Sequence, residues 1–72
     1  MAGLIGKDVH GNTVVVNLVQ VSAAEFAEPK GGRKHPQLEL VLTGGHKVVF
    51  YGTEAQVNWD MVKKHFEVRD GI

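Results

Sequence analysis

Histidines are the residues of this chain best suited to bind a metal ion or transfer a proton at neutral pH. There are four: His10, His35, His46 and His65. They show no His-Glu-x-x-His spacing, and no two of them are four residues apart, as two ligands on one helical face would be. The most specific metal or proton-transfer site that we can suggest combines His46 with Asp8 or Glu39, but no motif supports it. We therefore expect no metal and no other cofactor.

The sequence also lacks the patterns of nucleophilic and acid–base catalysis. Ser22 is the only serine, and no Gly-x-Ser-x-Gly elbow surrounds it. The glutamates are spread along the chain without the pairing that glycoside hydrolysis requires. Neither Gly31-Gly32 nor Gly44-Gly45 lies in a phosphate-binding fingerprint. We predict that the protein is not an enzyme.

A basic loop is the one candidate for nucleic-acid binding. Residues 29–36, PKGGRKHP, are predicted to form an exposed loop because two prolines bracket two glycines. The basic side chains of the loop are Lys30, Arg33, Lys34 and His35. With Phe26 and Tyr51 as stacking residues, the loop would suit single-stranded nucleic acid. The alternative is a solvated loop whose charges have no ligand.

Chain length and composition favour one small domain, residues 1–72, that associates with copies of itself. A domain of 72 residues buries only about 60% of its unfolded surface, so its core is thin. The chain has no cysteine, so disulfides cannot support that core. Oligomerisation is the remaining common support, and we expect a homo-oligomer with a dimer favoured.

Charge and hydrophobicity exclude further classes of protein. Eight Lys and Arg residues balance eight Asp and Glu residues, so no net charge attracts nucleic acid or a membrane. The longest apolar run is too short to span a bilayer, and the amino terminus lacks a signal-peptide pattern. We expect a cytoplasmic protein without a membrane partner.

The clearest predicted element is an amphipathic helix over Thr53–Phe66, TEAQVNWDMVKKHF. Thr53 followed by Gln56 matches a capping box. One apolar stripe with spacings of four, three and four comprises Ala55, Trp59, Val62 and Phe66. We predict that this stripe faces the core. Val57 and Met61 lie on nearly the opposite side, either as isolated surface residues or as part of a partner contact.

Three segments within the first 28 residues are predicted to be strands. Leu4 to Val9 is a short edge strand, and Thr13 to Asn17, TVVVN, is a continuous apolar run, which predicts a strand covered on both faces. Asn17 to Gln20 interrupts the pattern as a corner or bulge. Val21 to Glu28 resumes as a strand, with Phe26 on one face and Val21 on the other. Residues 67–72 are polar and are expected to fray.

Gly44-Gly45 predicts a hairpin between residues 37–43 and 46–51. A two-residue loop would place Leu38 opposite Tyr51, whereas a three-residue loop would place it opposite Phe50. The second register sorts polarity better, because its apolar residues then share one face. The other face holds Val41, Val49 and Tyr51, which are more apolar than a solvated sheet surface requires.

These observations predict an α+β fold: a small antiparallel meander of four to five strands with one C-terminal amphipathic helix on one face. Our first functional hypothesis is a non-enzymatic interaction module, most simply a homodimer. Its expected interface comprises Val41, Val49, Tyr51, Val57 and Met61. The second hypothesis is a single-stranded nucleic-acid-binding module that uses Lys30, Arg33 and Lys34.

Overall fold

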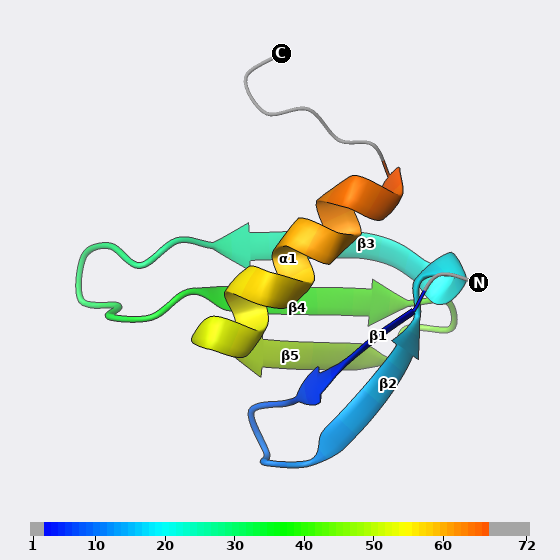
Figure 1. Cartoon of the computed structure of the whole chain (residues 1–72), viewed down its shortest axis with the longest axis horizontal. Coiled ribbons are helices and arrows are strands. Elements are labelled where there is room, and N and C mark those ends of the chain that lie inside the picture. The colour runs from blue at the N-terminus through cyan, green and yellow to red at the C-terminus, as the bar shows by residue number, and fades with distance from the viewer. Residues whose placement is uncertain (1–2, 67–72) are drawn as a thin grey trace.

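The computed structural model describes residues 3–66, which form five strands, one 3-10 helix and one α-helix (Figure 1). The elements are β1 (Gly3–Lys7), β2 (Thr13–Asn17), η1 (Leu18–Gln20), β3 (Val21–Ala27), β4 (Gln37–Leu42), β5 (Lys47–Tyr51) and α1 (Thr53–Phe66). The fold is α+β, as predicted. The tail expected to fray, residues 67–72, lies outside the described residues. Neither helix within residues 3–66 has the length and hydrophobicity needed to cross a bilayer.

The strands form two antiparallel sheets, which corrects the prediction of a single meander. β1 pairs with β2, while β3, β4 and β5 form the second sheet in that order. The corner at η1 separates them: the Asn17 side chain accepts a hydrogen bond from Val19 N at 3.0 Å, and Leu18 turns into the core. The chain therefore leaves β2 in a new direction before β3 begins. The two sheets meet where Val9 N donates to Val49 O at 2.9 Å.

β4 and β5 pair in the register that gathers apolar residues on one face. Leu38 lies opposite Phe50, and Leu40 lies opposite Val48. All four side chains are buried. Residues 43–46 connect the two strands, and Leu42 N donates to His46 O at 2.7 Å across this turn. Gly44 and Gly45 have φ angles of 95° and 89°, which disfavour any side chain.

An irregularity in β3 corrects the predicted sorting of its side chains. The pairing with β4 shifts between Val21 and Ala23, and Ser22 Oγ donates a hydrogen bond to Val41 O at 3.0 Å. An extra residue at this point reverses the alternation of the strand. Val21 is consequently buried, and it joins the same core as the half-buried Phe26.

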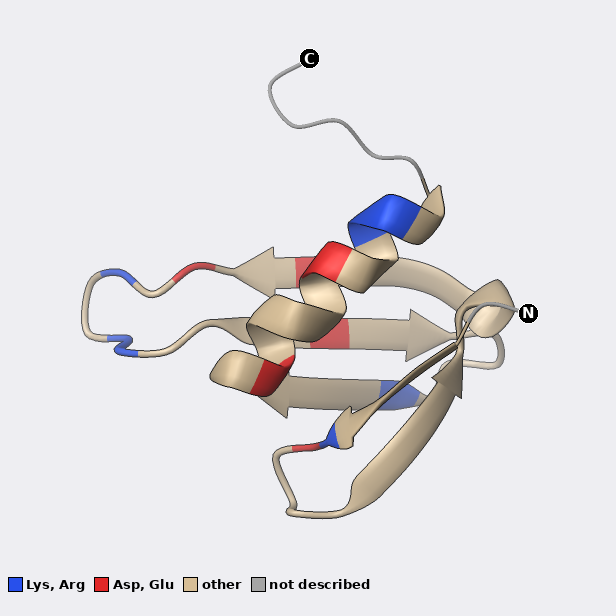
Figure 2. Ribbon diagram, viewed as in Figure 1, with Lys and Arg blue, Asp and Glu red and all other residues tan. Residues whose placement is uncertain are grey.

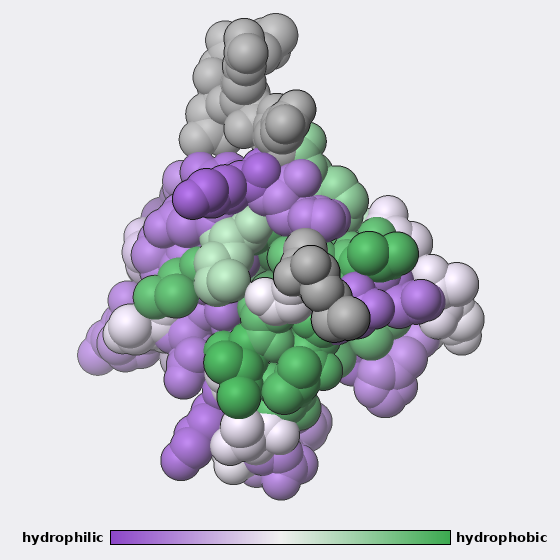
Figure 3. All heavy atoms as spheres, turned by 45° about the vertical axis from the view of Figure 1, so that its right-hand side comes forward, coloured by the Kyte–Doolittle hydropathy of each residue, from purple (hydrophilic) through white to green (hydrophobic). Residues whose placement is uncertain are grey.

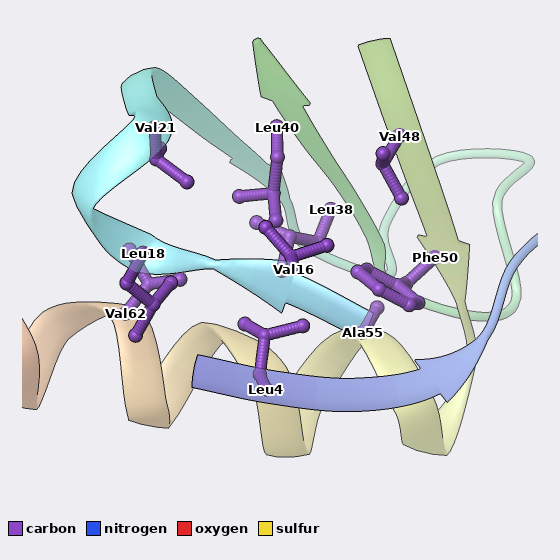
Figure 4. Packing of buried hydrophobic residues seen from close by; sticks show 10 residues of the cluster. All are labelled: Leu4, Val16, Leu18, Val21, Leu38, Leu40, Val48, Phe50, Ala55 and Val62. Carbon is purple, nitrogen blue, oxygen red and sulfur yellow. The ribbon is translucent and has the colours of Figure 1, made fainter. Parts of the chain in front are cut away.

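The core lies between the three-stranded sheet and two elements that cover the same face of it, α1 and the β1–β2 hairpin (Figure 4). The buried hydrophobic residues are Leu4, Val16, Leu18, Val21, Leu38, Leu40, Val48, Phe50, Ala55 and Val62. β2 thus covers the inner face of the sheet beside the helix, and the outer face of the sheet has no described element over it.

The buried side of α1 differs from the predicted stripe. Ala55, Asn58 and Val62 are buried, Trp59 is half-buried, and Phe66 is 46% exposed. Phe66 is therefore not the core anchor that its spacing suggested. Periodicity of apolar residues alone could not identify this side, because one of its three residues is a polar asparagine.

The start of α1 also differs from the prediction. Gly52 precedes the helix with a φ of 69°, and its carbonyl accepts a hydrogen bond from Gln56 N at 3.2 Å. The Gln56 side chain donates to Asp60 Oδ1 at 3.4 Å. Thr53 lies inside the first turn, so among the described residues the capping box is not formed.

Candidate interaction surfaces

The outer face of the three-stranded sheet carries three of the five predicted interface residues. Val41 and Val49 are half-buried, and Tyr51 is 46% exposed. Each valine has a charged residue directly across from it: Lys47 lies opposite Val41, and Glu39 lies opposite Val49. The valines therefore do not form a continuous apolar surface on this face.

The other two predicted interface residues lie on a different surface. Val57 and Met61 project from the exposed side of α1, 51% and 41% exposed, and adjoin β1 and β2 of the hairpin. With Ile5 and Val15 they line a shallow depression of about 470 Å³. We call these four residues the hairpin face. The structure therefore divides the predicted interface between two surfaces, because the sheet and its core separate α1 from the outer sheet face.

The alternation of the β1–β2 hairpin explains why this face is apolar. Leu4 pairs with Val16, and both side chains enter the core, whereas the neighbouring pair, Ile5 and Val15, points to solvent. Val15 is 75% exposed. The prediction that the β2 strand is covered on both faces is thus wrong for a single copy of the chain. Figure 3 shows hydrophobic atoms gathered over this hairpin.

The backbone of β2 is also available on one side. Asp8 N donates to Asn12 O at 2.9 Å at the turn of the hairpin. In an antiparallel pair the direction of the backbone groups alternates, so Val14 and Val16 face β1 while the N–H and C=O of Val15 face away. Within residues 3–66, β2 pairs with β1 alone.

A glycine and an asparagine allow the hairpin to lie against α1. Gly6 is buried, and a Cβ added there would lie 2.7 Å from Glu54 Oε2 and 2.8 Å from Asn58 Nδ2. Asn58 is 1% exposed, and its Nδ2 has no hydrogen-bond partner among the described residues. Asn58 also lines the depression of the hairpin face, so one buried polar side chain borders this mainly apolar surface.

A second surface lies on the other side of α1. Phe26 and Trp59 stack with ring centroids 5.2 Å apart and an interplanar angle of 1°. Lys63 Nζ lies 5.7 Å from the Trp59 ring centroid. These residues line an open cleft of about 620 Å³ together with Lys30 and Arg33 of the β3–β4 loop. We call this the aromatic cleft. Figure 2 shows the basic residues of that loop and of the end of α1.

The structure brings only part of the predicted nucleic-acid site together. Lys30 and Arg33 line the aromatic cleft with Phe26, but Lys34 is not among the lining residues. Tyr51 packs edge-on against His35 on the outer sheet face, with ring centroids 5.6 Å apart. Tyr51 therefore cannot serve as a stacking residue of this cleft.

The histidines lie in separate elements. His10 and His46 are exposed in two different hairpin turns, and His65 packs against Phe66 with ring centroids 4.6 Å apart. The described residues include no group of three or more histidine, cysteine, aspartate or glutamate residues positioned to hold a metal ion.

Sequence reasoning missed four residues of the two surfaces. They are Ile5 and Val15 of the hairpin face, and Trp59 and Lys63 of the aromatic cleft. The continuous apolar run of β2 was a signal for Val15, and the four-residue spacing on α1 was a signal for the pair of Trp59 and Lys63. No family model, no curated protein sequence and no solved structure significantly matches this chain.

Proposed function

We propose that the protein is a non-enzymatic interaction module that forms a homodimer through the hairpin face. One observation carries the proposal: within residues 3–66, β2 has one unpaired edge and one exposed apolar face, although its sequence is that of a strand covered on both faces. Exposed edge strands in monomers are usually protected by charge, proline or a bulge. The five residues of β2, TVVVN, contain none of these protections.

A second copy of the chain fits this edge because the sequence of β2 is self-complementary in polarity. In an antiparallel pairing centred on Val15, each Val15 lies opposite the same residue of the second copy. Thr13 then lies opposite Asn17, and Val14 lies opposite Val16. Polar residues are thus paired with polar residues, and apolar residues with apolar residues. Such a pairing is isologous, as a two-fold dimer requires. The outward backbone groups of Val15 would gain the partners that the monomer does not provide.

The area of the hairpin face is consistent with a dimer. Its four apolar residues are between 41% and 75% exposed, and the largest apolar patches on monomers, about 300 to 600 Å², are often functional. A stable dimer buries about 800 Å² on each partner. The edge of β2 and the polar rim of Lys7, Thr13 and Asn17 would supply the remainder. In this arrangement α1 is apolar on two sides: Ala55 and Val62 face the core, and Val57 and Met61 face the second copy.

Substitution of Val15 tests the proposal. Val15→Lys places a charge at the centre of the edge, where the two copies would bring like charges together. Light scattering on a sizing column should give twice the 7.9 kDa chain mass for the unmodified protein and the single chain mass for the variant. Circular dichroism should show that the variant stays folded, because Val15 is exposed in the single chain.

Tyr51→Lys is the matched control on the outer sheet face, where the exposed fraction of the side chain is 46%. This variant should keep the dimer mass. The opposite pattern, a dimer with Val15→Lys and a monomer with Tyr51→Lys, would transfer the interface to the outer sheet face. A monomeric unmodified protein at every concentration would refute self-association.

A further inference from the structure

The aromatic cleft offers a flat apolar surface next to cations. Phe26 and Trp59 are both half-buried, so their stacked rings retain some solvent contact. Lys63 Nζ lies over the Trp59 ring at 5.7 Å from its centroid. The position of this cation indicates a ring face that another planar or cationic group can approach. A nucleobase is such a planar group, and all four types of base can stack on tryptophan.

Positive charge is concentrated at the cleft, although the net charge of the whole chain is zero. Lys30 and Arg33 enter from the β3–β4 loop, and Lys63 enters from α1. Arg33 Nη1 donates to Glu28 O at 3.5 Å, which holds the guanidinium near the cleft. Glu28 also lines the cleft and is the only acidic residue to do so among those described, so the local charge remains positive.

We infer that the aromatic cleft binds single-stranded nucleic acid, a role that does not depend on the hairpin face. A base stacks on the indole of Trp59 in place of the Lys63 ammonium, and that ammonium then contacts the neighbouring phosphate. Lys30 and Arg33 contact phosphates on the loop side, Arg33 through its two-pronged guanidinium. A duplex is a poorer ligand because its bases already stack within the helix.

An acidic peptide is the other chemistry that three cations could attract, and Trp59 distinguishes the two ligands. Because Trp59 is the only tryptophan of the chain, its fluorescence reports directly on the cleft. A stacked base quenches the indole, whereas a carboxylate chain that contacts only the lysines and the arginine leaves the ring unstacked. The probes are an oligothymidylate of about twelve nucleotides, polyglutamate and inorganic phosphate.

Titration with the oligothymidylate at low salt should quench Trp59 to saturation, and anisotropy of a labelled oligonucleotide should give the same affinity. The double variant Lys30→Ala/Arg33→Ala should weaken binding at least tenfold. The matched double variant Lys34→Ala/Lys64→Ala also removes two positive charges, but outside the cleft lining, and should change the affinity less than about twofold. This comparison distinguishes a site from general attraction. Trp59→Phe, followed by anisotropy, should keep the fold and weaken binding severalfold.

Three results would overturn the inference. The first is no quenching and no change in anisotropy at low salt. The second is binding of polyglutamate or inorganic phosphate with the affinity of the oligonucleotide, which would assign the cleft to anions in general. The third is equal weakening by the two double variants, which would remove the cleft as the site.

Discussion

The two surfaces beside α1 are built on different physical terms. The hairpin face presents aliphatic side chains and an unpaired strand edge, and its nearest charge on β1 is Lys7 at the rim. The aromatic cleft presents two stacked rings and is lined by three basic side chains. On α1, Gln56, Trp59 and Lys63 face the cleft, while Val57 and Met61 point roughly 150° away around the axis. One helix thus separates a surface suited to another polypeptide from a surface suited to an anion.

The largest expected effect comes from adding one methyl group beneath the hairpin. Gly6→Ala brings a Cβ to within 2.7 Å of Glu54 Oε2, 2.8 Å of Asn58 Nδ2 and 3.2 Å of Phe50 Cε1. The Glu54 and Asn58 side chains must therefore move aside, and the Phe50 ring, which is fully buried, must shift slightly. Overpacking of this kind should lower the free energy of unfolding by about 2 kcal/mol. Urea denaturation followed by circular dichroism measures the loss.

Gly32→Ala is the control for this prediction, because nothing lies within 4 Å of a Cβ at that position and its φ is not positive. The control should unfold like the original protein. Equal stability of the two variants would contradict the close seating of the hairpin on which the hairpin face depends.

The next largest expected effect is a difference between the two surfaces in the salt dependence of their binding affinities. Three phosphate contacts at about 0.7 counterions each give a slope near −2 for log affinity against log salt. Raising salt from about 50 to 500 mM should therefore weaken oligonucleotide binding about a hundredfold. The dimer is held by apolar contact and backbone hydrogen bonds, so its dissociation constant should change by about twofold or less. Sedimentation and anisotropy at matched salt would contradict the comparison if both affinities fell together.

Met61→Lys should have a smaller effect confined to the hairpin face. The charge would lie at the α1 side of the depression and weaken the dimer about tenfold, which corresponds to the apolar contact of one half-exposed side chain. The control Met61→Leu retains the apolar volume and should leave the dimer affinity unchanged. Oligonucleotide affinity should stay unchanged in both variants, and a parallel loss would show that the two surfaces are not independent.

The smallest expected effect concerns the outer sheet face, which neither surface uses. Glu25 lies directly opposite Glu39 across β3 and β4, and like charges in that position repel. Glu39→Gln should raise the free energy of unfolding by about 0.5 kcal/mol without changing the dimer or the cleft. A change in solution mass would instead assign the outer sheet face to the interface.

Hydrophobic periodicity and turn residues predicted which segments form helices and strands better than they predicted which side of each element is buried. The helix over Thr53–Phe66 and the pairing of Leu38 with Phe50 follow from periodicity and turn chemistry. The division into two sheets does not, because it depends on how η1 redirects the chain. The buried position of Asn58 depends on the missing side chain at Gly6, fifty-two residues away in sequence, and no periodicity encodes such a contact.

The hairpin face and the aromatic cleft were each predicted only in part, because each combines segments that are distant in sequence. Val57 and Met61 could be recognised as a second apolar stripe, and Lys30 with Arg33 as a basic loop. Their partners come from distant segments: Val15 joins the first pair only after the hairpin folds onto α1. Lys63 joins the second pair only after the loop folds toward α1. Composition of the segments alone therefore could not assemble either surface.

Amide hydrogen exchange at Val15 tests the central claim, that a second copy pairs with the edge of β2. The Val15 N–H faces away from β1, so exchange in a single chain should be fast despite its place in a strand. The dimer predicts strong protection of this amide at high protein concentration, which is lost on dilution and is lost at a higher protein concentration in the Met61→Lys variant. Fast exchange of the Val15 amide in a sample whose mass shows a dimer would contradict the account, because the two copies would then meet elsewhere.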